Sequence, residues 1–172
     1  MSRLFIAEKP ELAKAIAAQV SSSFTRNDGF FECSNGDKVT WCFGHMLKLS
    51  DPEDYDQKYA KWSMADLPFC HVAWTKKVSE DKKKQVNIIK NLIKNAQAIV
   101  NAGDPDDEGQ LLVDELLEYF GNNKPVYRVL VNDYTPAIVK RALDAIENNK
   151  KYEHLGLQAE ARTVADQLFG YN

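Results

Sequence analysis

The sequence has few of the residues from which disulfide frameworks and zinc sites are built. Its 172 residues include three cysteines, an odd number without the paired spacing of a metal site; they are Cys33, Cys42 and Cys70. We therefore expect free thiols in a reducing compartment. No segment is apolar over the length of a membrane span, and the apolar run near the N-terminus is too short for a signal peptide. These absences predict a cytoplasmic protein.

An excess of positive charge is also missing. Lysine and arginine number 22 against 25 aspartate and glutamate, which gives a formal net charge of −3. This balance by itself argues against nucleic-acid binding, but the distribution of charge matters more than its sum, and part of the acid is concentrated in one turn. Internal repeats and low-complexity tracts are absent too. The length predicts one ordinary domain, with room for the beginning of another.

The chain is organised around that acidic turn. An apolar run at 98–103 ends in a glycine, four carboxylates follow, and residues 110–120 then show apolar side chains at helical spacing. The four carboxylates are Asp104, Asp106, Asp107 and Glu108. Carboxylates this close repel one another unless a cation or a helix N-terminus compensates their charge. Oxygen ligands without histidine or thiolate nearby favour Mg²⁺ or Ca²⁺ over zinc.

Three interpretations of the turn remain open from its residues alone. The first is a solvated helix start, where the helix dipole favours acidic residues. The second is a calcium loop of the EF-hand type, which Asp104, Asp106 and Glu115 match in spacing. Glu108 is off that pattern, however, and a strand rather than a helix is predicted before the loop. The third is a catalytic Mg²⁺ site at the carboxyl end of a strand in an α/β sheet.

The hydrophobic pattern predicts an α/β fold with a mostly parallel sheet flanked by helices. Strands alternate with helices after a β-hairpin whose turn is Asn35-Gly36, and at least three strands should be parallel. The segment 50–75 has little periodicity, which is typical of a functional or surface-wrapping segment. The predicted strands are 4–7, 30–33, 39–43, 98–103 and 126–131, and the predicted helices are 10–20, 79–97, 110–120, 135–148 and 153–169.

Glu8 and Lys9 follow the first predicted strand as the acidic turn follows a later one. In a parallel sheet both loops lie at the same edge, so Glu8 is expected to meet the acids of the turn across neighbouring strands. A carboxyl group beside such a cluster can keep its proton near neutral pH and act as a general acid. Lys9 can neutralise a phosphate oxygen. Alone, the two residues indicate a surface pair flanking a proline; beside the acids, the catalytic interpretation is favoured.

Three ordered motifs give the sequence a family resemblance. They are Ile6-Ala7-Glu8-Lys9-Pro10, Gly44-His45-Met46-Leu47 and Gly103-Asp104-Pro105-Asp106-Asp107-Glu108-Gly109. Together they resemble the Toprim domain of type IA DNA topoisomerases, and segments 41–45 and 59–62 are similar to those of bacterial topoisomerase III. The match covers essentially all 172 residues. It implies a Rossmann-like Toprim fold over residues 1–150 and, over 151–172, the start of the gate-forming region that follows it in the family.

The resemblance also implies roles for individual residues. Glu8 would be the catalytic glutamate with Lys9 beside it. The ligands of Mg²⁺ would be Glu8, Asp104, Asp106 and Glu108. Positions that match DNA-contacting residues of the family, which binds single-stranded DNA, are Trp62, His45, Arg162 and Gln167. From the sequence alone, a core or loop anchor is the better interpretation of Trp62.

Two positions depart from the family's pattern. The acidic motif usually carries arginine where this sequence has Asp107, which makes the turn more negative and removes a phosphate or carboxylate partner. Gln167 stands where topoisomerase III tends to have tryptophan. The first departure bears on the affinity of the turn for a cation, and the second bears on contact with DNA.

The implied activity is ATP-independent cleavage and religation of a DNA strand. In the family a tyrosine attacks a phosphodiester, forms a 5′-phosphotyrosine link and frees a 3′-hydroxyl, while Mg²⁺ positions the strand and the glutamate handles the proton. None of the seven tyrosines here matches the nucleophile's context. We therefore expect further topoisomerase domains C-terminal to Asn172, inactivity of this chain alone, and a DNA-associated protein. The alternatives are a free-standing Toprim nuclease or primase-type domain, and a non-catalytic calcium-binding module.

Overall fold

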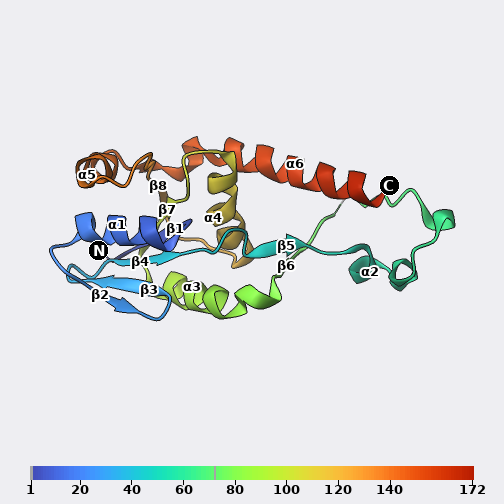
Figure 1. Cartoon of the computed structure of the whole chain (residues 1–172), viewed down its shortest axis with the longest axis horizontal. Helices are drawn as coiled ribbons and strands as arrows, with labels where there is room; N and C mark the ends of the chain where they lie inside the picture. The colour runs from blue at the N-terminus through green and yellow to red at the C-terminus, as the bar shows by residue number, and fades with distance from the viewer. Residues whose placement is uncertain (1, 72) are drawn as a thin grey trace.

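Four parallel strands form the centre of the structure, a computed structural model that describes residues 2–71 and 73–172. Antiparallel strands extend both edges, so that the described residues form a seven-stranded sheet (Figure 1). In sheet order its strands are β2 (Phe24–Asn27), β3 (Phe30–Cys33), β4 (Lys38–Trp41), β1 (Arg3–Ala7), β7 (Ala98–Ala102), β8 (Val126–Arg128) and β9 (Glu147–Asn148). Strand β1 is parallel to β4 and β7, and β7 is parallel to β8, which confirms the predicted mostly parallel sheet.

Apolar runs explain why the central strands form. Strands β1 and β7 are buried almost throughout, as expected for parallel strands that are covered on both faces. Their register places Ala7 opposite Ala102. The residues that follow, Glu8 and Gly103, therefore begin neighbouring loops at the same edge of the sheet, where open α/β sheets bind their ligands.

A hydrophobic core lies on each face of the sheet, beneath helices whose apolar residues recur at helical spacing. One face is covered by α1 (Pro10–Val20) and α5 (Pro136–Asp144), and the other by α3 (Lys83–Asn95) and α4 (Asp107–Tyr119). The longest helix, α6 (Glu153–Tyr171), packs against α4 through the small buried residues Gly156 and Ala159, which allow a close approach. Among the described helices, none combines the length and apolar character that crossing a bilayer requires.

The segment without periodicity forms an arm that projects from the sheet. A two-stranded antiparallel ribbon, β5 (Leu47–Leu49) and β6 (Lys76–Val78), forms its base. Beyond the ribbon lie α2 (Pro52–Tyr55), η1 (Gln57–Ala60) and η2 (Met64–Asp66). Buried Phe69 contacts the rings of Tyr55, Tyr59 and Trp74, and Tyr171 from the end of α6 completes this cluster. Aromatic packing thus gives the arm a small core of its own.

The hairpin and the free cysteines are confirmed. Strands β3 and β4 pair antiparallel around the predicted turn. All three cysteines are free, and two of them, Cys33 and Cys42, are buried. Burial is the main cause that raises the pKa of the Cys33 thiol to about 11 and the pKa of Cys42 further, so both are inert hydrophobic side chains.

Several predicted boundaries were wrong. Helix α4 begins at Asp107 instead of Gln110, because Asp106 caps it. Helix α5 ends at Asp144; the last two residues of the predicted helix form β9 instead, and η4 (Asn149–Lys151) follows. Helix α3 is preceded by the short helix η3 (Glu80–Lys82), and β8 ends three residues early. Strands β2, β5 and β6 were not predicted at all.

Candidate metal and DNA site

The carboxyl ends of β1 and β7 bring three charged side chains together. The backbone N–H of Asp104 donates to Glu8 Oε2 at 3.2 Å. Lys9 Nζ lies 2.8 Å from Asp104 Oδ2 and 3.3 Å from Glu8 Oε1. The hydrogen bond to Asp104 is the main cause that holds the pKa of Lys9 above its usual range, so this lysine is a permanent positive charge. The predicted meeting of Glu8 with the acidic turn is confirmed for Asp104, and the ion pair of Lys9 with Asp104 was not predicted.

Glycines let the acidic turn pack tightly against the start of α4. A Cβ atom on Gly103 would lie 1.9 Å from the carbonyl oxygen of Gly109, and one on Gly109 would lie 2.3 Å from the carbonyl oxygen of Asp104. Either contact is far inside van der Waals distance, so only glycine allows the backbone to approach this closely. Asp106 then caps α4, since its Oδ1 accepts from the N–H of Gly109 at 2.7 Å.

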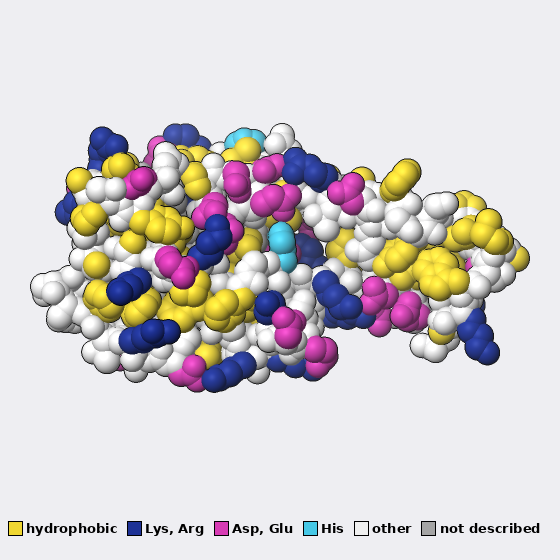
Figure 2. All heavy atoms as spheres, viewed as in Figure 1, with side chains coloured by type: hydrophobic (Ala, Val, Ile, Leu, Met, Phe, Trp, Pro, Cys, Tyr) yellow, Lys and Arg dark blue, Asp and Glu magenta, His cyan; other side chains and the backbone are white. Residues whose placement is uncertain are grey.

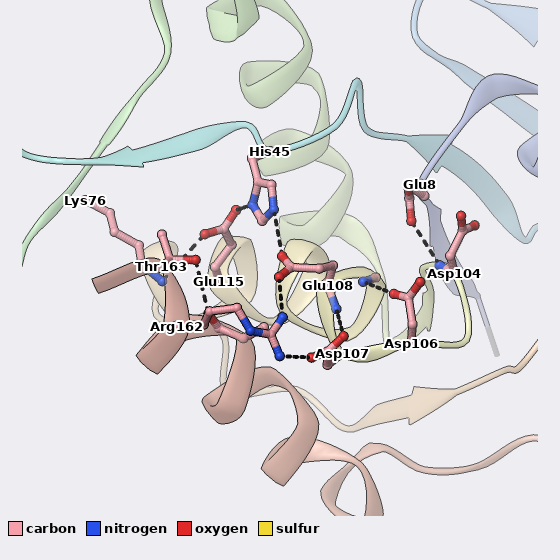
Figure 3. A network of polar contacts seen from close by, with 12 residues as sticks. Glu8, His45, Lys76, Asp104, Asp106, Asp107, Glu108, Glu115, Arg162 and Thr163 are labelled. Atoms are coloured by element: carbon pink, nitrogen blue, oxygen red, sulfur yellow. Dashed lines mark hydrogen bonds and ion pairs between the residues drawn. The ribbon is translucent and has the colours of Figure 1, made fainter. Parts of the chain in front are cut away.

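The next two acids face α6. Arg162 donates to Asp107 Oδ2 at 2.7 Å and to Glu108 Oε1 at 3.2 Å (Figure 3). The hydrogen bond from Arg162 lowers the pKa of Asp107. Asp107, the residue that replaces the family's usual arginine, therefore points toward a guanidinium group supplied by a helix 55 residues further along the chain.

His45 links Glu108 to a buried carboxylate. Its Nδ1 lies 3.1 Å from Glu115 Oε1 and its Nε2 lies 3.3 Å from Glu108 Oε2 (Figure 3). The hydrogen bond to Glu115 raises the pKa of His45, and this outweighs the opposing effect of burial. Lys76 compensates the other side of the buried carboxylate, because its Nζ lies 3.5 Å from Glu115 Oε2 and 2.6 Å from Glu160 Oε1.

The four predicted metal ligands lie along one edge but do not converge. Glu8 is beside Asp104, whereas Asp106 caps a helix and Glu108 binds Arg162 and His45. Within residues 2–71 and 73–172, no three side chains of ligand type gather closely enough to hold a metal ion. Hard oxygen donors suit Mg²⁺, which is commonly held by one or two carboxylates with waters and substrate phosphate completing its shell. The donor set is compatible with that mode of binding and not with an all-protein cage.

The calcium-loop interpretation is wrong in its geometry. An EF-hand needs a helix on each side of its loop, but strand β7 precedes this turn. Helix α4 already begins at Asp107, within the span that would have to wrap a calcium ion.

The residues predicted to contact DNA fall in two places. His45 and Arg162 lie at the acidic turn, and Trp62 and Gln167 lie where the arm meets α6. Trp62 is 55% exposed, with its ring 5.6 Å from that of Tyr171, so it is not a core residue. Figure 2 shows acidic side chains over the middle of this face and hydrophobic ones over the arm at the right. Gln167 donates to the carbonyl of Ser50 at 3.3 Å, which joins α6 to the arm.

Sequence reasoning missed one residue beneath the turn. Arg128 of β8 is 2% exposed, and its guanidinium donates to the carbonyl oxygens of Gly103 at 2.8 Å and Asp104 at 2.7 Å. The available signal was a single cationic residue inside the apolar run 126–131. A charge in a buried strand needs polar partners, and the nearest end of a neighbouring strand was the acidic turn.

Comparisons with known proteins show the family of the chain. The Toprim domain family model matches residues 3–134. A DNA topoisomerase 3 from Vibrio cholerae is 43% identical over 100% of this chain, and one from Salmonella typhimurium is 45% identical over 99%; the chain covers 27% of each relative. A DNA topoisomerase 3 from Bacillus cereus is 35% identical over 97% of the chain, which covers 23% of it.

A solved structure shares the fold. The structure of full-length topoisomerase I from Thermotoga maritima superposes with a TM-score of 0.53 at 19% identity, over 84% of this chain and 21% of that one. The likeness supports the Toprim arrangement of the sheet and its helices. Since the family model also matches well over half of the sequence, the chain belongs to the Toprim domain family.

Proposed function

We propose that this chain provides the acidic site for Mg²⁺-dependent, ATP-independent DNA strand cleavage and religation of the type IA topoisomerase kind. The observation that carries the proposal is the cluster of Glu8, Lys9 and Asp104 at the ends of adjacent parallel strands. The relatives described above are named DNA topoisomerase 3. The chain covers at most 27% of the length of each of them. The tyrosine nucleophile and the gate therefore belong to other domains in our proposal.

Glu8 moves the proton in the proposed reaction. Its carboxylate is oriented by the N–H of Asp104 and by Lys9, and its side chain is 18% exposed, so a DNA strand at the sheet edge can reach it. As a general acid it would protonate the leaving 3′-oxygen on cleavage, and as a base it would take the proton back on religation. Lys9, half exposed, would transfer its hydrogen bond from Asp104 to a phosphate oxygen when the strand binds.

Asp104, Asp106, Glu108 and Glu8 are the groups that would hold Mg²⁺. The ion would position the phosphodiester and offset its developing charge. Asp104 is nearest to Glu8, whereas Glu108 must first exchange its contacts with Arg162 and His45. Those contacts are exposed ion pairs, which contribute little in water, so an arriving cation can displace them.

Single-stranded DNA is the proposed partner, which makes the protein DNA-associated and, by its free thiols, cytoplasmic. Trp62 offers an exposed ring on which a base can stack, a contact that tolerates any sequence. His45 and Arg162 would meet the strand near the acidic turn, and Gln167 near the arm.

A chimera tests the proposal. The chain would replace the segment of the Vibrio cholerae relative that it matches. This match covers the whole length of the chain. We expect Mg²⁺-dependent, ATP-independent relaxation of supercoiled DNA. Glu8→Gln in the chimera should reduce it ~10²–10⁴-fold because the amide cannot exchange a proton. Glu11→Gln, an exposed glutamate on α1, is the matched control. Equal activity of the two variants at equal folding would reject the role of Glu8.

A further inference from the structure

A buried charge without a carboxylate partner lies beneath the acidic turn. Arg128 heads the fully buried side chains when the described residues are ranked by volume. Burial lowers its pKa to about 10, so the guanidinium is still charged at neutral pH. Among the residues that the structure describes, no carboxylate forms an ion pair with it. Burying a charge is costly, and hydrogen bonds must compensate for the lost water.

Most of the compensating acceptors are backbone carbonyl groups, and the side-chain oxygen Oδ1 of Asn101 adds one more at 3.2 Å from Nη1. Nη1 donates to Gly103 O at 2.8 Å and Nη2 to Asp104 O at 2.7 Å. Nη1 also approaches Asn101 O at 3.3 Å and Val129 O at 3.2 Å. Two of these carbonyls belong to consecutive residues of the acidic turn. One guanidinium group therefore holds the backbone of the acidic turn at Gly103 and Asp104, where the carboxylates of the turn begin.

The same peptide units are fixed from the other side. The N–H of Asp104 donates to the carboxylate of Glu8. The carbonyl oxygen of Asp104 also accepts from the N–H of Asp106 at 2.8 Å. The first turn of α4 packs so closely that Gly109 admits no Cβ atom. The turn is thus held between Arg128 on one side and α4 on the other.

We propose that Arg128 is a positioning residue of the candidate site, which directs the carboxylates of Asp104 and Asp106 by fixing the backbone that carries them. It touches neither the cation nor DNA, and the inference rests on the proposed function. A planar fork with several N–H groups can hold two consecutive carbonyls at once, whereas a lysine ammonium is a single point of charge on a flexible stem. Arginine is therefore required at this position, and charge alone is insufficient.

Arg128→Lys tests the proposal in this chain, with Arg141→Lys on the exposed side of α5 as the matched control. In metal-free protein, we expect the amide of Asp106 to exchange with solvent faster in Arg128→Lys than in Arg141→Lys, because its acceptor, the carbonyl oxygen of Asp104, loses the second donor that fixes it. Mg²⁺, titrated against amide chemical shifts of 103–110, should bind ~10–100-fold more weakly. Ile89→Ala, a core substitution on α3 away from the turn, lowers the stability of the protein. It should leave the exchange rate of the Asp106 amide and the affinity for Mg²⁺ unchanged.

The outcomes separate this inference from the proposed function. If the original protein binds no Mg²⁺ at the turn, the metal proposal fails, while amide exchange still decides the role of Arg128. Exchange and affinity equal to those of Arg141→Lys would overturn the inference, and so would changes no larger than those of Ile89→Ala. Should Arg128→Lys not fold, the unsubstituted protein gives a second measurement. Its Arg128 Nη protons should be resolved and protected from exchange; averaged, rapidly exchanging signals would contradict the fork.

Discussion

At the scale of single residues, each acid of the turn has its own compensating group. This explains how four carboxylates are tolerated so close together, since like charges destabilise one another unless each is offset. The partners are Lys9 for Asp104, a helix N–H for Asp106, Arg162 for Asp107, and both Arg162 and His45 for Glu108. Sequence spacing predicted the crowding but not these partners, because three of them come from distant segments.

His45 should make folding stability depend on pH. Its pKa is raised in the folded protein, chiefly by Glu115, so its contribution is fully present below its ordinary pKa of about 6.5 and is lost as pH rises through the higher folded value. We expect the difference in unfolding free energy between the unsubstituted protein and His45→Gln to shrink as pH rises above about 6.5. Urea unfolding of metal-free protein at a series of pH values measures it. A difference that grows with pH would contradict the assigned contact.

At the scale of elements, the start of α4 serves two purposes. Asp106 caps the helix through its side chain, and in the proposed function it is also a metal ligand. A helix N-terminus favours negative charge, which helps to hold acids there without any cation. The turn is therefore a helix start, as one interpretation predicted. A helix start is compatible with the catalytic interpretation of the same residues.

Two substitutions of Asp106 separate these purposes. Asp106→Ala removes the cap and should lower the unfolding free energy by ~1 kcal/mol, whereas Asp106→Asn keeps a capping oxygen and should change it by only a few tenths. Both should weaken Mg²⁺ binding, since each removes a carboxylate. Denaturant unfolding and a Mg²⁺ titration on the same samples give the answer. Undiminished Mg²⁺ binding in both variants would remove Asp106 from the metal site.

Long periodic elements were predictable from the sequence, and short ones were not. The apolar runs of β1 and β7 and the helical pattern of α4 indicated the elements that carry Glu8 and the acidic turn, and the pattern of α3 indicated a helix that covers the sheet. Strands β5 and β6 have three residues each, too few to show alternation, and form only because they pair with each other. The partners of the acids and the contacts of Arg128 depend on tertiary packing, which spacing along the chain does not encode.

At the scale of the whole molecule, the arm sets Trp62 apart from the acidic turn, and the proposed DNA path connects the two. Trp62→Ala should weaken binding of single-stranded oligonucleotides by ~1–3 kcal/mol, the usual value of stacking one base on an aromatic ring. The unfolding free energy should change little, because Trp62 is 55% exposed and its ring contact is with Tyr171 at the end of α6. Met64→Ala, at a residue 85% exposed on the same arm, is the control. Fluorescence anisotropy measures both; equal affinities would show that Trp62 does not stack on DNA.

The chain by itself should neither relax supercoiled DNA nor form a covalent adduct, because the proposed nucleophile lies on another domain. Incubation with single-stranded DNA and Mg²⁺, followed by denaturing electrophoresis, is the measurement. A denaturation-resistant protein–DNA complex would contradict this prediction. Release of shortened, unjoined strands would instead support the Toprim nuclease alternative, in which the metal site acts without tyrosine.

The arm is attached to the body twice, and this has a mechanical consequence. The ribbon of β5 and β6 is one connection, and the C-terminal end of α6 is the other (Figure 1). Helix α6 is joined to the arm by the hydrogen bonds of Gln167 to Ser50 and of Asn172 to Phe69. An arm that is connected to the body at two places bends less easily than an arm on a single hinge. Tension applied to a strand stacked on the arm would therefore load α6, the helix whose middle carries the contacts of Arg162 with the acidic turn.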